Sequence, residues 1–458
     1  MKAVLISLLL LSGPVRVSAE RLTVGPGQAF LSIRAAVERA QPGDTVRVQA
    51  GTYREQVELE KPLVLEGIGR PVLRGSGQGS VLVARADRCT VTGFIIEHSG
   101  GDLQQEDSGI LLKSSRNRIE NNELRDILFG IYLYQSQGNT IRRNVIRGRR
   151  TLPVGDRGAG LHLWNSPENV IEENTISDAR DGMYIQNSPD NRIRSNRVFG
   201  LRYGVHYMYS DANRFEDNLF SRNVAGAAIM YSKRIVFRRN AFVHNRGFSS
   251  FGILFQDCEE CIAEENFILD NATGLFLEAL RRSTFRRNII AENDVAIQMF
   301  SSAENNLFTG NNFVENLSPL QLIGRQSTTR WGRDGRGNFW SEYDGYDLDG
   351  DGVGDVPHKV QNVFEYLEGN YPRLRLYLQS PAAQALAVAD QAFPVVEGSP
   401  EVDATPLMRP VRVLGRVDQA RPRRSTHGVL AAIALAMLSA ALAVIWIGQR
   451  RRAVVGGR

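Results

Sequence analysis

The feature that most constrains this chain is a short motif, Asn-x-(Ile/Phe)-x-x-Asn-x-apolar, that recurs through the middle of the sequence. Its second Asn stands at nine positions, most of them 22 residues apart: 122, 144, 174, 196, 218, 240, 266, 288 and 311. Two solenoid folds have a period of about 22 residues, the leucine-rich repeat and the parallel β-helix.

The residues between the turns decide between these two folds. They alternate and are rich in Ile, Val, Phe and Tyr, which is typical of strands, and no helical signal separates one turn from the next. We therefore expect an all-β fold, a right-handed parallel β-helix of about a dozen coils. A short amphipathic helix followed by a strand is predicted within residues 32–55, where it would cap the open end of the solenoid.

Each predicted strand opens on a small residue, such as Gly160, Gly182 or Gly204, and this anchor sets the register. The positions one and three past the anchor are apolar, so they face the interior. The charged pairs before each second Asn alternate in sign from coil to coil, which predicts ion pairs between coils. Position six carries serines that we interpret as a hydrogen-bonded ladder: Ser115, Ser136, Ser166, Ser188, Ser210, Ser232 and Ser302.

The positions two and four past the anchor face outward and form an apolar, aromatic surface. They include Tyr132/Tyr134, His162/Trp164, Tyr184/Gln186, His206/Met208, Ala228/Met230, Leu254/Gln256 and Phe276/Glu278. Glycoside hydrolysis needs a pair of carboxylates, and no second acid faces Glu278 from an adjacent coil. We therefore expect no catalytic residues, which argues against a polysaccharide lyase or hydrolase. A carbohydrate-binding surface formed by Tyr132, Tyr134 and Trp164 stays open as an alternative.

Three side chains on this surface fall together: His206, Met208 and Met230. The two methionines occupy the same position in adjacent coils, about 4.8 Å apart, and His206 is two residues from Met208 on the same strand. Imidazole with thioethers is a soft ligand set that suits Cu(I), so the pattern predicts a copper site. The alternative is that the methionines pack under a loop or a partner protein. Chain insertions before Gly160 and Gly252 flank the patch.

An Asp-rich turn lies beyond the repeats. Asp347, Asp349, Asp351 and Asp355 match the opening of a calcium-binding loop. The twelfth position of the loop is His358, where a bidentate Glu is expected. A calcium site and a plain Asp/Gly turn therefore both stay open.

The two ends of the chain carry apolar segments. Residues 1–19 have the pattern of a secretory signal peptide. Residues 428–448 are uncharged and long enough to span a bilayer, which takes about 20 residues. An exported protein stopped by this helix would leave residues 449–458 in the cytoplasm. The net charge of +5 is small and the basic residues are interleaved with acidic ones, so nothing indicates nucleic acid.

These observations predict an order of segments along the chain. The N-terminal cap and first coils take residues 20–108, and the repeats that define the β-helix take residues 109–325. A C-terminal cap with the Asp-rich turn follows over 326–379. A short helix that begins at Ser380 and a Pro-rich tether then fill residues 380–427, up to the membrane helix.

Four segments together resemble the NosD family, periplasmic proteins that serve the maturation of nitrous oxide reductase: HYMYSDANRFEDN, VAGAAIMYS, RGFSSFGILFQ and GNFWSEYDGYDLDGDGVGDVP. The resemblance runs from the cap near residue 25 to Pro406. It implies a periplasmic β-helix that works with the permease and ATPase of an ABC transporter. It also implies two further partners. One is the apo nitrous oxide reductase, whose copper–sulfide centre is being assembled, and the other is a copper chaperone.

The resemblance also implies roles for particular residues. His162, Trp164 and Tyr184 would belong to a face that binds a partner protein, and Pro406, Leu407 and Met408 would engage the transporter. The predicted membrane helix departs from the soluble form of the family, so we expect a protein anchored in the inner membrane. Whether copper or sulfur is the cargo stays open.

Overall fold

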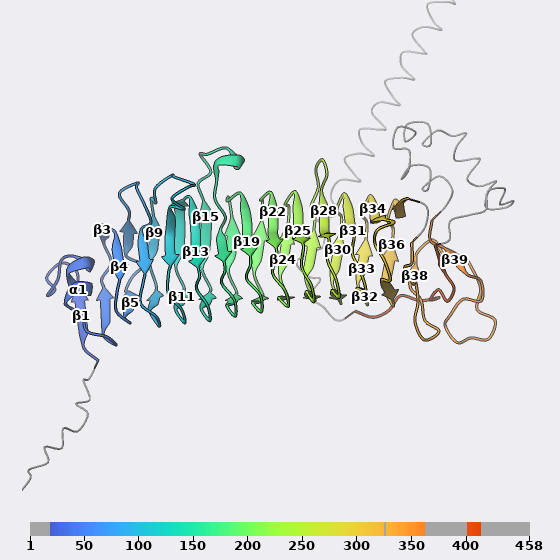
Figure 1. Ribbon diagram of the computed structural model, residues 1–458, viewed down its shortest axis with the longest axis horizontal. Helices are drawn as coiled ribbons and strands as arrows, with labels where there is room; N and C mark the ends of the chain where they lie inside the picture. The colour runs from blue at the N-terminus through green and yellow to red at the C-terminus, as the bar shows by residue number, and fades with distance from the viewer. Residues whose placement is uncertain (1–18, 325–326, 362–400, 414–458) are drawn as a thin grey trace, which may run out of the picture. The chain divides into compact units, whose positions relative to one another are not determined.

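The computed structural model describes residues 19–324, 327–361 and 401–413. Over these ranges the chain is an all-β parallel solenoid with coils of about 22 residues, as predicted (Figure 1). Its right-handed sense stays a prediction. Residues 1–18 of the predicted signal peptide, the predicted helix after Ser380, the membrane helix and the tail lie outside the described residues. In the three described ranges, no helix combines the length and the apolar character that crossing a membrane requires.

Each coil contributes one strand to each of three parallel sheets, which we call sheets A, B and C. Sheet A contains β1 (Arg21–Val24), β2 (Thr45–Val48), β5 (Val64–Gly67), β8 (Thr90–Thr92), β11 (Arg118–Glu120), β14 (Thr140–Arg142), β17 (Val170–Glu172), β20 (Arg192–Arg194), β23 (Arg214–Glu216), β26 (Val236–Arg238), β29 (Ile262–Glu264), β32 (Thr284–Arg286) and β35 (Leu307–Thr309).

Sheet B contains β3 (Thr52–Arg54), β6 (Val72–Arg74), β9 (Ile95–Glu97), β12 (Glu123–Ile127), β15 (Val145–Gly148), β18 (Thr175–Ser177), β21 (Arg197–Phe199), β24 (Leu219–Ser221), β27 (Ala241–Val243), β30 (Phe267–Leu269), β33 (Ile289–Ala291), β36 (Asn312–Val314) and β38 (Phe339–Trp340).

Sheet C carries the outward face that the sequence singled out. Its 12 strands agree with the expected dozen coils: β4 (Val57–Leu59), β7 (Leu82–Ala84), β10 (Ser108–Leu112), β13 (Phe129–Tyr134), β16 (Leu161–Trp164), β19 (Asp181–Gln186), β22 (Tyr203–Met208), β25 (Ala225–Met230), β28 (Phe251–Gln256), β31 (Thr273–Glu278), β34 (Val295–Phe300) and β37 (Ser318–Ile323).

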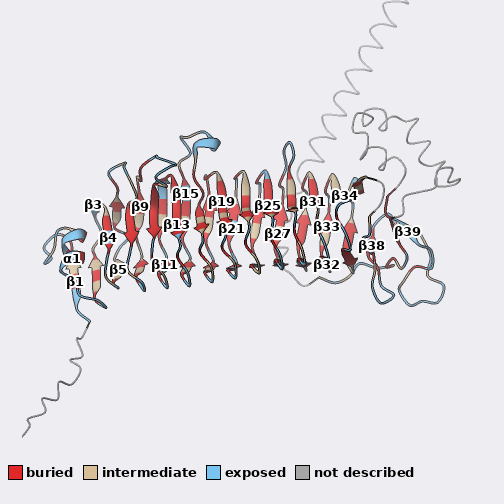
Figure 2. Cartoon of the chain, viewed as in Figure 1, coloured by how far each residue is buried: buried red, intermediate tan, exposed pale blue. Residues whose placement is uncertain are grey.

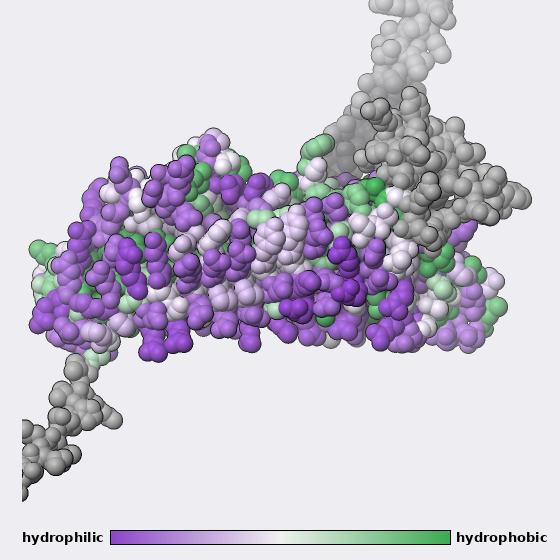
Figure 3. Space-filling view, in the orientation of Figure 1, coloured by the Kyte–Doolittle hydropathy of each residue, from purple (hydrophilic) through white to green (hydrophobic). Residues whose placement is uncertain are grey.

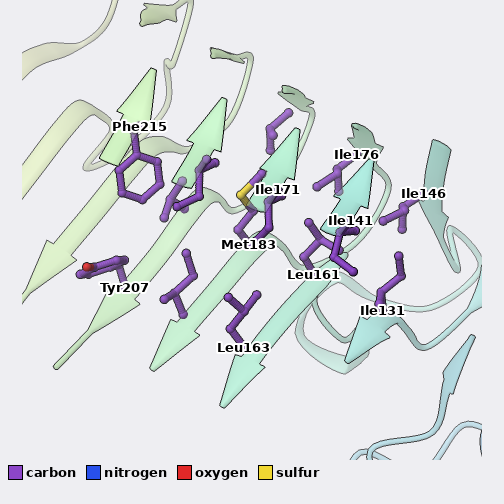
Figure 4. Packing of buried hydrophobic residues seen from close by; sticks show 14 of the residues in the cluster. Ile131, Ile141, Ile146, Leu161, Leu163, Ile171, Ile176, Met183, Tyr207 and Phe215 are labelled. Carbon is purple, nitrogen blue, oxygen red and sulfur yellow. The ribbon is translucent and has the colours of Figure 1, made fainter. Parts of the chain in front are cut away.

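The core runs along the inside of the coils, where the three sheets meet (Figure 2). Equivalent side chains of successive coils stack on one another, as Phe215 does on Phe237 with ring centroids 4.7 Å apart. Figure 4 shows this packing around Met183 and Tyr207, both of which are fully buried. The positions one and three past each anchor therefore face inward, as the register predicted.

Buried asparagines hold the turns of successive coils together. In a typical case, the backbone N–H and the amide of Asn174 both donate to Oδ1 of Asn196, at 3.0 Å each. Asn196 then donates in the same way to Asn218. The alternating charges form the expected ion pairs, such as Arg142 with Glu172 at 3.2 Å and Arg286 with Glu264 at 3.1 Å.

The serine ladder is confirmed over five coils and wrong at both of its ends. The backbone N–H of each of Ser136, Ser166, Ser188 and Ser210 donates to the hydroxyl of the next serine, the last of which is Ser232. In place of Ser115, the buried Ser114 takes the ladder position, and Ala303 takes the place of the exposed Ser302. The reason is that the ladder position lies five residues past the anchor in the coil of Ser114 and seven residues past it in the coil of Ala303, instead of six.

Separate caps close the two ends of the core. At the start, α1 (Ile33–Arg39) begins after the N-cap Ser32 and covers the first coil with Ile33, Ala36 and Val37. The helix that was predicted there is thus present, and Glu55 accepts from its first backbone N–H groups.

At the other end, residues 401–413 return to the last coils. β39 (His358–Lys359) pairs with β40 (Val402–Asp403). The buried carboxylate of Asp403 accepts from Trp340 Nε1 at 3.0 Å, which ties this segment to the core. Val411 and Asn312 exchange two further hydrogen bonds.

Candidate metal site

The structure confirms that Met208 and Met230 are neighbours in sheet C. Met208 pairs with Met230, and His206 pairs with Ala228, across the parallel strands β22 and β25. Both methionines are half-buried, so their thioethers are not part of the core. Ala228 is the smallest side chain of its column and is only 3% exposed. The two sulfurs and the imidazole thus share one small area of the outer face.

The outer face has a third column of side chains, which the predicted register did not include. It is formed by the residue immediately before each anchor. Asp181 and Tyr203 are paired members of this column. The anchor glycines approach each other so closely that a Cβ on Gly182 would lie 2.6 Å from the carbonyl oxygen of Gly204. The strand bends here, and the side chain before the bend joins the outer face. Tyr203 shows this, because its ring centroid is 5.1 Å from that of His206.

Asp181 organises the surroundings of His206. Its side chain is 0% exposed, and its Oδ2 lies 3.3 Å from Nδ1 of His206. The guanidinium of Arg202 binds the same carboxylate through both oxygens, at 2.9 and 2.7 Å. Burial would raise the pKa of Asp181, but the hydrogen bonds with His206 and Arg202 and the charge of Arg202 outweigh burial and hold this pKa below its ordinary value. The carboxylate is therefore ionised.

An aromatic column leads from His206 towards the N-terminal coils. The ring centroids of Tyr132, His162, Tyr184 and His206 follow one another at 4.3, 4.6 and 4.9 Å. Both ring nitrogens of His162 are buried without a hydrogen-bond partner among the described residues. Burial, reinforced by Arg180, lowers the pKa of His162 to about 3, so its imidazole is neutral. His162 and His206 are brought into one column but are separated by Tyr184.

Tyrosines and chain insertions border the methionine pair on opposite sides. Tyr209 and Tyr231 follow the two methionines directly; their rings stack at 5.1 Å and remain 54% and 41% exposed. The two insertions precede the strands of sheet C and rise from the same edge in Figure 1. Leu152 of the first insertion packs against the buried cluster of Leu128, Phe129 and Ala159, whereas Phe248 of the second is almost fully exposed. On the side of the molecule in view in Figure 3, most of the surface is hydrophilic.

The remaining features of this face bear on carbohydrate chemistry. Gln256 donates to Glu278 at 3.1 Å. Asp181, an acid of this face that the predicted register did not include, is four coils from Glu278, which corresponds to about 19 Å and is too far for a hydrolytic pair. Tyr132 is 1% exposed and its hydroxyl donates to Glu106, so it offers no open ring for a sugar. Of the three predicted sugar-binding rings, the half-buried Trp164 and the more exposed Tyr134 remain accessible.

The Asp-rich turn brings three of its four predicted ligands together. Carboxylate oxygens of Asp347, Asp349 and Asp351 lie within 4.8 Å of one another, and Asp355 instead accepts from the backbone of Leu348. The twelfth residue, His358, packs its ring on Trp340 with the centroids 4.9 Å apart. Burial lowers the pKa of His358 to about 4. This histidine therefore belongs to the cap rather than to the loop.

The segment that the resemblance assigns to the transporter packs directly against this turn. Pro406 and Leu407 are buried, and Met408 is half-buried. The backbone N–H of Met408 donates to Gly352, and Pro406 accepts from Gly354. The first two residues thus have a structural role in the cap, and Met408 is the more accessible of the three.

Comparisons with known proteins agree with this architecture. A family model described as "Periplasmic copper-binding protein (NosD)" matches residues 148–345, and a model for a family of unknown function matches residues 23–235. Two solved structures share the fold at low identity. They are the catalytic unit of an α-1,3-glucanase from Streptomyces thermodiastaticus (14% identity, TM-score 0.54, 70% of each chain) and the A-module of the mannuronan C-5 epimerase AlgE6 from Azotobacter vinelandii (15%, 0.52, 66% of this chain and 93% of that one).

Two bacterial relatives are similar over most of their length. The chain is 37% identical to the "Probable ABC transporter binding protein NosD" of Pseudomonas aeruginosa, over 84% of this chain and 95% of that protein. It is 36% identical to the protein of the same description from Stutzerimonas stutzeri, over 79% and 86% of the two chains. On this evidence the chain belongs to the NosD family.

Proposed function

We propose that this protein is a copper-handling maturation factor for nitrous oxide reductase that works in the periplasm with an ABC transporter. In this proposal His206, Met208 and Met230 hold Cu(I). The observation that carries it is the register of β22 and β25, which places two thioethers and one imidazole on adjacent outward positions. The description of the family model as a periplasmic copper-binding protein supports the choice of metal.

The chemistry of the donor set fits copper in its reduced state. Thioether and neutral imidazole are soft ligands, and Cu(I) is the biological cation that prefers them. The thiols of Cys258 and Cys261 would be stronger ligands, but both are buried in the core, on the inner side of the coils. Bound copper would be the cargo, which the side chains of this face hold until a partner receives it.

The transfer partners are part of the proposal. The names of the relatives support an ABC transporter, with its permease and ATPase, as one partner. The apo nitrous oxide reductase would dock on the outer face of sheet C, where Tyr209 and Tyr231 offer exposed rings beside the methionines. Tyrosine is among the side chains that contribute most to binding at protein interfaces. The transporter would contact the C-terminal cap, around Met408 and the Asp-rich turn, and the predicted membrane helix would anchor the chain.

An anaerobic Cu(I) competition titration of the full chain in mild detergent tests the metal site. The informative variant is Met208→Leu/Met230→Leu, which removes both sulfurs and keeps the volume of the side chains. Met183→Leu is the matched control, because Met183 is fully buried in the core.

We expect tight binding by the wild type and the control, and its loss in the double variant. Equal binding of Cu(I) by all three proteins would mean that the copper site lies elsewhere in the chain. If the wild type bound no Cu(I), the face would be left as a docking surface, and glycan binding would be measured next with Trp164→Ala as the comparison.

A further inference from the structure

A buried carboxylate, Asp181, contacts the imidazole that the copper proposal uses. Asp181 opens β19, next to Tyr203 in the following coil, and Tyr203 comes three residues before His206. The imidazole therefore meets Asp181 on the side that faces the start of its strand. Met208 lies two residues further along β22, in the direction away from the start of the strand. One ring nitrogen of His206 is thus engaged by Asp181.

The contacts of His206 Nδ1 define which nitrogen carries the proton. An ionised carboxylate can only accept hydrogen bonds, so Asp181 Oδ2 at 3.3 Å requires a proton on Nδ1. Arg202 Nη2 is also near Nδ1, at 3.5 Å, but it has a shorter contact of 2.7 Å with Asp181. With the proton on Nδ1, the lone pair of the neutral ring is on Nε2. No hydrogen bond to Nε2 is formed within the part of the chain that the structure describes.

Similar clusters elsewhere in the chain show what is particular about this one. His98 contacts Asp126, which Arg149 also binds, and His244 contacts Asp270, which Arg246 also binds. Both clusters follow strands of sheet B, and their carboxylates are 49% and 27% exposed. Asp181 is 0% exposed and belongs to β19 of sheet C. A carboxylate–histidine contact of this kind is the common way in which proteins orient a metal-binding imidazole.

The cluster carries no net negative charge, because one carboxylate faces two guanidinium groups. The negative charge of Asp181 is bound by Arg202 through two hydrogen bonds, and Arg180 Nε lies 3.5 Å from the same carboxylate. No negative charge is therefore left over to balance a divalent cation at Nε2. The donors that His206, Met208 and Met230 then offer are one imidazole nitrogen and two thioether sulfurs, none of which carries charge.

We infer that Asp181 is a positioning residue for the copper site. It keeps the proton of His206 on Nδ1 and leaves Nε2 as the free donor, while Arg202 cancels its charge so that the site takes a monovalent soft cation. This inference rests on the proposed function. It adds to that function a residue that contacts no metal, and it explains why a charged side chain is fully buried beneath an otherwise apolar face.

The experiment combines two measurements on the full chain in mild detergent. The first reads the tautomer of His206 in the metal-free protein by long-range ¹⁵N–¹H correlation NMR with ¹⁵N-labelled histidine. The chain has six histidines, so the spectrum is simple, and His206→Gln assigns the signal. The second is the anaerobic Cu(I) competition titration, with Zn(II) as the divalent comparison.

Two variants remove the positioning group, and one serves as control. Asp181→Asn is the direct test, and Asp181→Asn/Arg202→Gln repeats it without leaving an unpaired guanidinium, in case the single variant folds poorly. Asp270→Asn alters the equivalent contact of His244 on sheet B. We expect the wild type and Asp270→Asn to keep the Nδ1–H form of His206 and to bind Cu(I) but not Zn(II). In both Asp181 variants we expect a shift to the Nε2–H form and a Cu(I) affinity about 10–100-fold lower.

The outcomes separate this inference from the proposed function. If the Asp181 variants keep both the Nδ1–H form and the wild-type Cu(I) affinity, the inference is overturned and the copper proposal stands. If the wild type binds no Cu(I), the proposed function fails, and the inference fails with it. Binding of Zn(II) by the wild type as tightly as Cu(I) would overturn the part that concerns monovalent selectivity.

Discussion

At the scale of single residues, the outer face of sheet C retains polar groups that a purely apolar surface would not need. His162 is neutral and has two buried, unpartnered nitrogens, and Asp181 is a fully buried anion. Each such group costs free energy unless it is compensated. Asp181 is compensated by Arg202 and His206. His162 has ring contacts with Tyr132 and Tyr184 in place of hydrogen bonds, and its burial disfavours the charged form of the imidazole.

The depressed pKa of His162 predicts a pH-dependent stability. Its pKa is about 3 in the folded protein and about 6.5 when unfolded, so between these values the unfolded chain binds the extra proton. The free energy of unfolding should therefore fall as the pH is lowered from about 6.5 towards 3, by up to about 1.4 kcal/mol per unit from this residue. Urea unfolding of His162→Phe at several pH values should show a shallower decline than the wild type. Parallel pH profiles for the two proteins would contradict this assignment.

The stacked tyrosines beside the methionines are predicted to contribute to binding of the apo-enzyme but not to binding of Cu(I). Tyr209 and Tyr231 have positive φ angles of 52°, which bulky residues rarely adopt, and the same position holds Asn165 and Asn187 in earlier coils. Tyr209→Asn/Tyr231→Asn should therefore fold and bind Cu(I) normally. We expect it to bind apo nitrous oxide reductase at least about tenfold more weakly in biolayer interferometry, which is about 1.4 kcal/mol. Unchanged affinity for the apo-enzyme would place docking elsewhere.

Only some of the side chains around the candidate metal site could be predicted from the sequence. The positions two and four past each anchor located His206, Met208 and Met230 because the strands alternate regularly beyond the glycine. Asp181 and Arg202 escaped because they lie before the glycine, where the bend of the chain interrupts the alternation. The available signal was an acid directly before an anchor glycine, present in one coil among uncharged equivalents.

At the scale of the element, the asparagine ladders hold each coil to the next. Asn196 accepts two hydrogen bonds from Asn174 and donates to Ile171, Arg194 and Asn218. These ladders were predictable, because a buried amide that repeats at the period of the coil can pair with its own equivalents. The serine ladder was predicted less well, since Ser114 and Ala303 show that one residue more or less in a strand shifts the position.

The ladder predicts a large cost for removing a single amide. Asn196→Ala would remove the acceptor of the buried backbone N–H of Asn174 and the hydrogen bonds that the amide of Asn196 donates, so we expect a loss of about 2–4 kcal/mol in the free energy of unfolding. Gln104→Ala is the control, because this amide is exposed, and it should change the free energy by less than about 0.5 kcal/mol. Chemical denaturation of both variants measures the difference. A similar small effect in both would mean that the ladder contributes little.

The Asp-rich turn predicts a stabilisation by calcium. With a dissociation constant of about 1 mM, typical of extracellular sites, 10 mM Ca²⁺ would add about 1.4 kcal/mol. Differential scanning calorimetry should then show a higher melting temperature with Ca²⁺ than with Mg²⁺, and Asp349→Asn/Asp351→Asn should abolish the difference. Identical melting temperatures in the two salts would leave the plain Asp/Gly turn as the better interpretation, with backbone N–H groups as the partners of Asp347.

At the scale of the whole molecule, the described coils form a stack in which each contacts its two neighbours. Such architectures tolerate the loss of a complete repeat, since the ladders and the core can rejoin in register. The coil that is removed then decides which function is lost.

This independence predicts the outcome of two matched deletions. Removing residues 197–218 joins Asn196 to Leu219, which occupies the place of Arg197 one coil earlier, and takes out His206 and Met208. Removing residues 267–288 joins Asn266 to Ile289 in the same manner and keeps the site. Both proteins should retain the circular dichroism of a β-solenoid, but the first should lose tight Cu(I) binding and the second should keep it. Copper binding by the first would exclude the proposed donors.

The two chain insertions, finally, have a consequence for how such a protein can change. They leave from the edge between sheets B and C, whereas the turns that carry the long asparagine ladder keep nearly constant length in neighbouring coils. Doubling the length of a surface loop costs about 0.6 kcal/mol of closure entropy, a small amount for a stack of this size. Recognition of a new partner could thus arise by lengthening the loops at one edge, without disturbing the donors or the coils that hold them.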